Sequence, residues 1–525
     1  MQNRENQELG SNWVWGIPIL LLSFGLAIPH YLQDAVWFDE AYTHLYSSTG
    51  RIPSGSIIDS ILLIAKTDVW PPGWYLLFMA WGKIAGRVDF SYYVLPTLIG
   101  LISISVIFRL GKSLYGDKQG ITASLMLATS AIFIHYTHEI RAYTLFVLVV
   151  SVVLLYYWML VTRKNVQVRW LRWGFSFSIG IALYVHFVAG AFLLGIIIYH
   201  LLCEHPSRSL NPYMTMKRWQ DIIRLWINGC LLFSPWLAML IGSLVAESGD
   251  SRGLPVDESA QYIIYSLSNN LSLIFLAIFL GSLLLWKMKQ VRFLWIWFLG
   301  SLVAISIFHT LSGFLFHPRH VLPLIIVMIL LIIPVLDKID LRFKGLSMIL
   351  IGLYAGAGIA FSMTPNFMTF ISTHIAPIPL ATINEMQTIN EQCVQDDDAV
   401  IFSVDNAENV KVQQVMLEYY FLGEIRNFNQ LGRLTTYIDE TGEIVPLTSD
   451  DMRDSISDYT LAYDNVWLMH LPTLANAPSI IQFDTIMSDL AYQNCFIPSS
   501  LHSDTWLYTT ADSCEAVLET CVLGE

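Results

Sequence analysis

The chain has 525 residues, of which 54% are hydrophobic and only 14% are charged, and its formal net charge is −13. Soluble domains carry roughly 25% charged residues. The deficit excludes an ordinary soluble protein and indicates a polytopic α-helical membrane protein. No nucleic-acid partner is expected.

The charge is unevenly divided along the chain. Residues 364–525 hold 4 Lys and Arg against 24 Asp and Glu, a balance of −20, whereas residues 1–363 hold 25 against 18, a balance of +7. Such an asymmetry is typical of two physical environments. It predicts a transmembrane domain over 1–363, a linker over 364–384 and an acidic soluble domain over 385–525.

Apolar runs of roughly 17–25 residues are long enough to span a bilayer. The first has no small-residue cleavage site and is expected to remain as an anchor. The run 173–202 is too long for one crossing and is expected to fold at His186, whereas 71–85 is short and indicates an interfacial or re-entrant helix. About eleven spans are expected, near 13–32, 91–110, 119–137, 143–162, 172–186, 187–203, 225–246, 269–286, 292–310, 321–336 and 345–363.

Lys and Arg predict the orientation, because cytoplasmic loops are enriched in both. A cytoplasmic N-terminus puts all five basic clusters on the cytoplasmic side. The first outer loop (33–90), the later loops 138–142, 247–268 and 311–320, and the tail then lie outside a plasma membrane. The clusters are Arg109/Lys112/Lys118, Arg163/Lys164/Arg169/Arg172, Arg208/Lys217/Arg218/Arg224, Lys287/Lys289/Arg292 and Lys338/Arg342/Lys344.

The acidic tail has the pattern of a small extracytoplasmic α/β domain. Residues 399–404, 465–471 and 505–509 read as strands, and 410–422 reads as an amphipathic helix. Two cysteines, Cys203 and Cys230, lie in or beside apolar runs and are expected to be core thiols. The other four lie in the tail, where two disulfides with three pairings and free thiols are both open; they are Cys393, Cys495, Cys514 and Cys521.

Four polar motifs from distant parts of the chain are predicted at the outer face. Carboxylates there supply a general base or bind a metal, and arginines match phosphate oxygens with their planar fork. Such a site suits a substrate with a lipid tail and a phosphate head. The motifs are Asp39-Glu40, Trp70-Pro71-Pro72-Gly73-Trp74-Tyr75, His138-Glu139-Ile140-Arg141-Ala142-Tyr143 and His317-Pro318-Arg319-His320.

With these residues the chain resembles the polyprenyl-phosphate-dependent membrane glycosyltransferases, which include the protein O-mannosyltransferases and the lipid A aminoarabinose transferases. The Asp-Glu pair, the Pro-Pro-x-x-Tyr motif and residues 91–161 carry the resemblance, which covers about 13–330. The run Arg-Leu-Gly-Lys-Ser-Leu-Tyr-Gly at 109–116 is most like the bacterial members. The resemblance implies a C-type glycosyltransferase-like fold and a polyprenyl-phosphate-linked sugar donor, with a lipid, glycan or protein acceptor.

The resemblance also implies roles for residues. Asp39 takes the position of the family's catalytic base, with Glu40 beside it, and the sugar is transferred with inversion. Arg319 takes the position of a late outer arginine that binds the leaving phosphate, and Arg141 is the second candidate. The remaining expected substrate-binding residues are Glu139, Tyr75, His320 and Tyr143.

The sequence departs from the family at two positions. His138-Glu139-Ile140-Arg141 stands where the family has a second Asp, so Glu139 is its candidate substitute. Trp70 stands where the aminoarabinose transferases have a Lys before Pro-Pro, and Lys66 lies one turn earlier.

Simpler interpretations remain open for these residues. Asp39 could cap an interfacial helix, Arg141 could pair with Glu139, and Arg319 could anchor at the headgroups. Trp74 and Tyr75 could belong to the aromatic belt of a membrane interface, as many such residues do.

Two further alternatives concern a cofactor and the overall function. A divalent cation at Glu40 and His138 is one alternative, because carboxylates and imidazoles suit zinc or manganese. A transporter or flippase of a lipid-linked saccharide is the competing function, although the chain shows no symmetry between its halves.

Overall fold

The computed structural model describes most of the chain. The described residues are 14, 16–31, 36, 38–50, 52, 55–67, 70–86, 89–163, 169–207, 213–237, 239, 264–312, 318–363, 380–404, 419–421, 428–431, 434, 436–438, 444–471, 478–497, 504–510 and 514. They form two compact units, one from 1–31 and 55–371 and the other from 32–54 and 372–525. Residues 32–54 therefore cluster with the acidic tail, not with the helices that the sequence analysis grouped them with.

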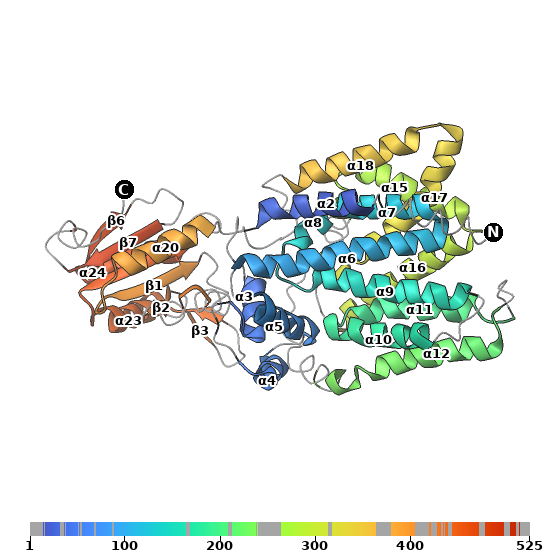
Figure 1. The fold of residues 1–525 in the computed structure, drawn as a ribbon. Helices are drawn as coiled ribbons and strands as arrows, with labels where there is room; N and C mark the ends of the chain where they lie inside the picture. The colour runs from blue at the N-terminus through green and yellow to red at the C-terminus, as the bar shows by residue number, and fades with distance from the viewer. Residues whose placement is uncertain are drawn as a thin grey trace. The chain divides into compact units, whose positions relative to one another are not determined.

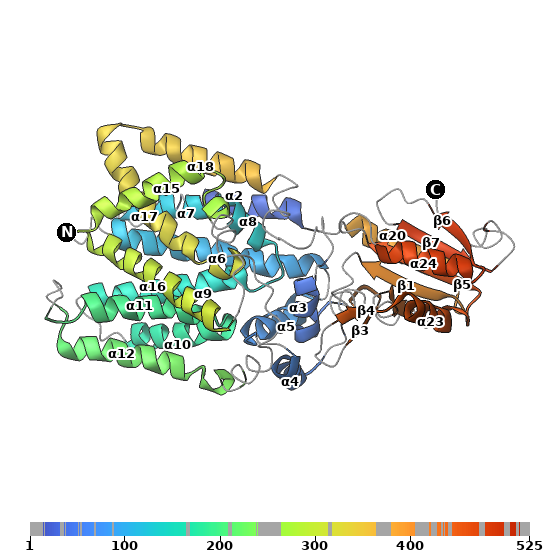
Figure 2. The ribbon, with the colours of Figure 1, turned by 180° about the vertical axis from the view of Figure 1, so that it is seen from behind.

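Unit 1 is all-helical among its described residues. Its longer helices run alongside one another in both views (Figures 1 and 2), with α6 against α7 and α9, α11 against α16, and α10 against α12. The helices are α2 (Gly16–Ala27), α4 (Ile57–Thr67), α5 (Gly73–Ala85), α6 (Asp89–Tyr115), α7 (Asp117–Ala128), α8 (Ala131–Thr137), α9 (Tyr143–Thr162), α10 (Arg169–Val185), α11 (Ala189–Cys203), α12 (Met216–Leu231), α15 (Ser272–Gly281), α16 (Lys289–Ser312), α17 (Leu324–Arg342) and α18 (Leu346–Ser362), with 3-10 turns η2 (Ile28–His30), η3 (Ser282–Leu285) and η4 (Pro318–Val321).

Within the described residues, three helices are individually long and apolar enough to cross a membrane: 90–115, 143–162 and 289–308. A fourth span results if α7 and α8, which meet at a 67° bend, are counted together. The expected number of about eleven spans stays a prediction. The expected fold at His186 is confirmed, because α10 ends at Val185 and α11 begins at Ala189.

The described residues of the five basic clusters lie at one end of the unit 1 helices. Four contacts join them: Lys118 Nζ to Asp340 Oδ2 at 3.7 Å, Arg218 Nη2 to the Arg163 carbonyl at 2.7 Å, Gln290 Nε2 to the Leu114 carbonyl at 3.1 Å, and Lys289 Nζ 5.8 Å from the Trp158 ring centre. Clusters that are far apart in sequence thus share one end, and the assignment of that end to the cytoplasm stays a prediction.

The bend between α7 and α8 is closed by one buried side chain. Asn269 donates from Nδ2 to the carbonyls of Thr129 (3.2 Å) and Tyr354 (3.0 Å), and its Oδ1 accepts from the Ala131 amide at 3.0 Å. Breaking a helix in an apolar interior frees backbone groups that must find other partners. Asn269, which is fully buried, supplies those partners.

We expect Asn269→Asp to lower the stability of unit 1 by about 1–3 kcal/mol, because a carboxylate cannot donate to the two carbonyls and leaves them without their partner. Unfolding in detergent can be followed with a thiol-reactive dye, because Cys203 and Cys230 of unit 1 are the free cysteines among the described residues. The matched control is Asn270→Asp, an exposed neighbour that shares the left-handed backbone conformation (φ +64° against +53°). Equal melting temperatures for the two variants would contradict the assigned role.

Unit 2 contains a mixed five-stranded sheet of order β2-β1-β5-β7-β6. The predicted strands at 399–404, 465–471 and 505–509 are β1 (Ala399–Val404), β5 (Asn465–Leu471) and β7 (Asp504–Thr509). The other elements are β2 (Phe428–Gln430), β6 (Gln493–Ile497), a β3–β4 pair (Thr436–Ile438 and Ile444–Pro446), α3 (Phe38–Ser47), α20 (Leu380–Gln392), α23 (Ser449–Thr460) and α24 (Pro478–Asp489). Of the predicted helix 410–422, only 419–421 is described, and it is helical.

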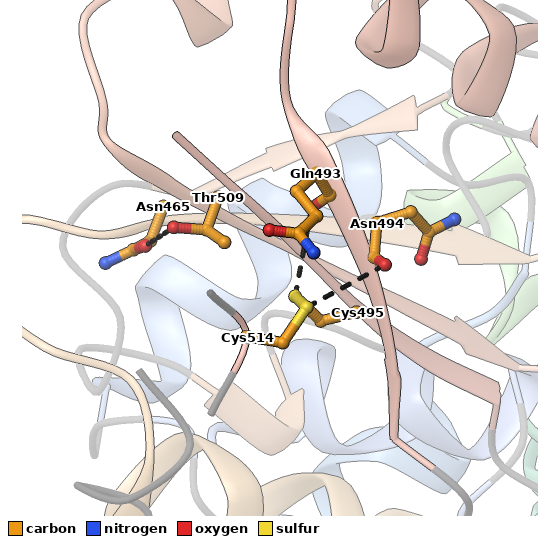
Figure 3. Close-up of a disulfide and its surroundings, with 6 residues drawn as sticks. All are labelled: Asn465, Gln493, Asn494, Cys495, Thr509 and Cys514. Carbon is orange, nitrogen blue, oxygen red and sulfur yellow. Dashed lines mark hydrogen bonds between the residues drawn. A yellow bond between two sulfur atoms is a disulfide. The ribbon is translucent and has the colours of Figure 1, made fainter. Parts of the chain in front are cut away.

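The sheet of unit 2 has an apolar core on each side. Ile456 of α23 and Phe483 of α24 pack with alternate strand residues on one side, and Met386 of α20 packs on the other. Figure 3 shows the disulfide between Cys495 and Cys514, 19 residues apart. Cys393 is also disulfide-bonded. Of the two alternatives left open for the tail cysteines, the structure therefore has disulfides.

Candidate active site

Three helix ends of unit 1 enclose one pocket, which we call the outer pocket. Trp70 lies just before α5, Arg141 lies in the turn between α8 and α9, and His186 lies between α10 and α11. Together the walls are Trp70, Pro71, Trp74, Tyr75, Arg141, Ala142, Tyr143, Val185 and His186. The second and third motifs of the sequence analysis thus meet around this pocket.

The fourth motif, His317-Pro318-Arg319-His320, contacts the residues of the outer pocket through the His320 ring. The His320 ring, on η4, lies 5.6 Å from both the Trp70 and His186 rings, and Trp70 lies 4.9 Å from His186. Phe146 of α9 stacks on His186 at 4.4 Å with an interplanar angle of 5°. Arg319 is adjacent to His320, so both arginine candidates belong to this neighbourhood. His317 lies outside the described residues.

The Pro-Pro-Gly step explains why Trp70 reaches His186. A Cβ atom on Gly73 would lie 2.4 Å from the Tyr184 carbonyl oxygen. Only glycine allows the first turn of α5 to approach the end of α10 this closely. The preceding prolines begin α5, since their fixed φ suits a first helical turn. This local geometry brings Trp70 beside His186.

His186 is a neutral side chain that lies near the positive charges of Arg141 and Arg319. It is 2% exposed, and its Nδ1 accepts from the Val188 amide at 3.3 Å. Burial, with smaller contributions from Arg141 and Arg319, lowers the pKa of His186 to about 3. Both guanidinium groups therefore act on this one imidazole, and the pocket beside it favours an anionic group such as phosphate.

Lowering the pH should reduce the free energy of unfolding of unit 1, because His186 is held neutral in the folded state. Its folded pKa is below the unfolded value of about 6.5, so the unfolded state binds the extra proton and stability falls as the pH drops from about 6.5 toward 3. We expect His186→Asn, which retains an acceptor for Val188, to show a weaker loss of melting temperature between pH 7 and pH 5 than the wild-type chain.

The matched control for this titration is His205→Asn. His205 Nδ1 accepts from the Ser207 amide at 3.3 Å, the same local arrangement, but at a partly exposed position. An unchanged pH profile in His186→Asn, or an equal change in His205→Asn, would contradict the assignment.

Glu139 contacts a histidine that the sequence analysis did not single out. Its Oε2 lies 3.5 Å from His135 Nε2, one turn earlier on α8. The His138 ring stacks on His30 at 4.5 Å and meets His135 edge-on at 5.3 Å. The spacing His135-x-x-His138-Glu139 in the sequence could have predicted that these side chains lie close together. Among the described residues, no group of three or more His, Cys, Asp or Glu side chains could hold a metal ion, including around Glu40 and His138.

Asp39 and Glu40 lie in unit 2, in the first turn of α3. The helix begins at Phe38, so Asp39 is within it and is not simply a cap of a helix starting at Glu40. Carboxylates at this end are favoured by the helix dipole. Asp39 is partly exposed and Glu40 is buried.

The structure locates the expected substrate-binding residues, whose roles in binding stay predictions. Tyr75, Arg141 and Tyr143 line the outer pocket, Arg319 and His320 adjoin it, and Glu139 contacts His135.

The aromatic-belt interpretation does not describe Trp74 and Tyr75, because both are buried in the pocket wall at 2% and 3% exposure. His186 was expected only as the turn between two spans, and its contacts with two motifs could not be read from the sequence.

Comparisons with known proteins show which proteins this chain is similar to. Residues 70–238 match the model of the dolichyl-phosphate-mannose-protein mannosyltransferase family. No curated protein matches the sequence. The fold is similar to ArnT from Cupriavidus metallidurans in the apo state, with 12% identity, coverage of 96% of this chain and 99% of that chain, and a TM-score of 0.60. The same protein bound to undecaprenyl phosphate gives the same identity and coverages and a TM-score of 0.57.

These findings confirm the predicted resemblance to polyprenyl-phosphate-dependent membrane glycosyltransferases, and the fold of the chain is similar to the fold of ArnT. The family match begins at Trp70 and includes every residue that lines the outer pocket.

Proposed function

We propose that the chain is an inverting glycosyltransferase that moves a sugar from a polyprenyl-phosphate donor to an acceptor at the outer face of the plasma membrane. The outer pocket carries this proposal. It combines the Arg141 guanidinium with aromatic walls and with a neutral His186. The positive charge of Arg319 also acts on the His186 ring. A cationic, aromatic-lined site suits a phosphate attached to a sugar and a lipid.

In the proposed reaction, a hydroxyl or amine of the acceptor attacks the anomeric carbon of the donor sugar. A bond forms between the acceptor atom and that carbon, the bond from the carbon to the phosphate oxygen breaks, and Asp39 accepts the acceptor's proton. The lipid phosphate leaves with the bonding electrons, and Arg141 and Arg319 stabilise its charge. Glu40 lies beside the base on the same helix turn. Attack from the opposite face of the sugar gives inversion.

The proposed orientation follows from the basic clusters. Their common end of unit 1 is assigned to the cytoplasm by the positive-inside rule, with the N-terminus on that side. The outer pocket and the acidic tail are then extracytoplasmic. Disulfides in the tail support this assignment, because they persist in oxidising compartments.

A flippase for the same lipid-linked saccharide is the second candidate, because the break between α7 and α8 is of a kind found in transporters. In this chain, however, the break is closed by Asn269, and the histidine and arginine groups lie at helix ends.

The experiment that tests the proposal is mass spectrometry of lipid that copurifies with the protein in detergent. A bound polyprenyl phosphate, with its sugar, is the expected result and identifies the donor. The purified protein reconstituted in vesicles with that donor should release free polyprenyl phosphate when acceptor-containing membrane extract is added. Movement of intact donor across the vesicle membrane without release would favour the flippase instead.

A further inference from the structure

The acidic tail has an apolar face that encloses the α3 segment. Ile383 and Met386 of α20 and Phe402 of β1 share one buried core with Val36 and Ala41, which lie just before and within α3. The helix that carries Asp39 and Glu40 is therefore part of the fold of unit 2, although more than 300 residues separate it from α20.

Two consecutive tyrosines hold the two ends of this helix. The Val36 amide, just before α3, donates to the Tyr420 hydroxyl. The Tyr419 ring packs against the His44 ring in the last turn, with ring centres 4.7 Å apart. Gln387 of α20 donates to the Tyr420 carbonyl at 3.1 Å, which links the tyrosine pair to α20.

The turn after α3 completes the contact with Tyr419. Gly50 has φ +61°, and a Cβ there would lie 2.9 Å from both Cε2 and the hydroxyl of Tyr419 and 2.8 Å from His44 Nδ1. That nitrogen lies 3.0 Å from Thr49 Oγ1. The close approach of chain and ring requires glycine here, for both space and backbone conformation.

Asp39 and Glu40 lie between these two points of attachment. We propose that Tyr419 and Tyr420 are positioning residues, through which the C-terminal unit fixes the orientation of the helix that bears the proton-accepting carboxylate. This inference rests on the proposed function of Asp39 for its catalytic consequence, but the attachment can be measured without it. The tail then has a defined task, which is to hold the first outer loop in one conformation.

Hydrogen exchange of the α3 amides tests the attachment in the full-length protein in detergent. Tyr420→Phe removes only the hydroxyl that accepts from Val36, and Gly50→Ala places a Cβ atom too close to both Tyr419 and His44. In both variants we expect the amides of residues 38–47 to exchange about fivefold faster or more. This is the increase expected when the free energy of local opening falls by the contribution of one hydrogen bond. Tyr419→Leu, which removes the ring that packs against His44, should also exchange faster than the wild-type chain.

Tyr492→Phe is the matched control in the same unit. Its hydroxyl donates to the Thr460 and Tyr463 carbonyls at 2.7 Å each, in the core on the opposite side of the sheet. It should leave α3 exchange unchanged. If Tyr492→Phe loosens α3 as much as Tyr420→Phe does, or if neither Tyr420→Phe nor Gly50→Ala changes α3 exchange, the proposal is overturned.

The catalytic consequence is a separate measurement. In release of polyprenyl phosphate from the copurified donor, Tyr420→Phe should lower kcat severalfold and leave KM for the donor unchanged, because it displaces the carboxylate and not the phosphate site. A loss of activity that comes from a higher KM alone, with kcat unchanged, would overturn the positioning role. An active Asp39→Asn would instead refute the proposed base, whatever the exchange data show, so the two failures are distinguishable.

Discussion

Replacing Asp39 with Asn should reduce sugar transfer by about 10²- to 10⁴-fold, the usual contribution of a positioned general base. The amide has nearly the shape of the carboxylate but cannot take the acceptor's proton. Because the phosphate-binding residues are unchanged, the variant should still copurify with its lipid. The measurement is the release of free polyprenyl phosphate from donor-loaded protein, together with mass spectrometry of the lipid that remains bound.

The control is the same substitution elsewhere in unit 2. Asp454 lies on α23 and is exposed, so Asp454→Asn should transfer sugar at the wild-type rate. Retained transfer in Asp39→Asn would remove Asp39 from the mechanism and leave Glu40→Gln as the next variant to measure.

Replacing Arg141 with Gln should weaken binding of the lipid phosphate. The guanidinium lines the outer pocket, and a hydrogen bond to a charged group contributes about 1.5–3 kcal/mol, which corresponds to about 10- to 150-fold in Kd. Arg141→Lys should recover part of this loss, since a lysine keeps the charge but not the two-pronged geometry. The measurement is titration of undecaprenyl phosphate into detergent-purified protein.

Arg224→Gln is the control for this titration. Arg224 is 71% exposed and contacts Asp221 at 3.4 Å at the basic end of unit 1. It should bind the lipid as the wild-type chain does. Equal affinities of Arg141→Gln and the wild-type chain would show that the outer pocket is not the phosphate site.

The sequence by itself determined the features that depend on local composition. Apolar runs and basic clusters follow from the cost of placing charge in a bilayer, so the helices of unit 1 and their common basic end could be predicted. Alternation of apolar residues likewise predicted β1, β5 and β7. Short motifs were sufficient to predict the resemblance that the family match confirms.

Only the tertiary structure decided what each motif contacts. His186 looked like a turn residue, yet packing places it against Trp70, Phe146 and His320. The α3 segment looked like a loop of the membrane domain, yet its core partners are tail residues such as Met386. Side-chain packing couples segments hundreds of residues apart through shape and burial, and neither the period of a helix nor the charge of a loop encodes which partners those are.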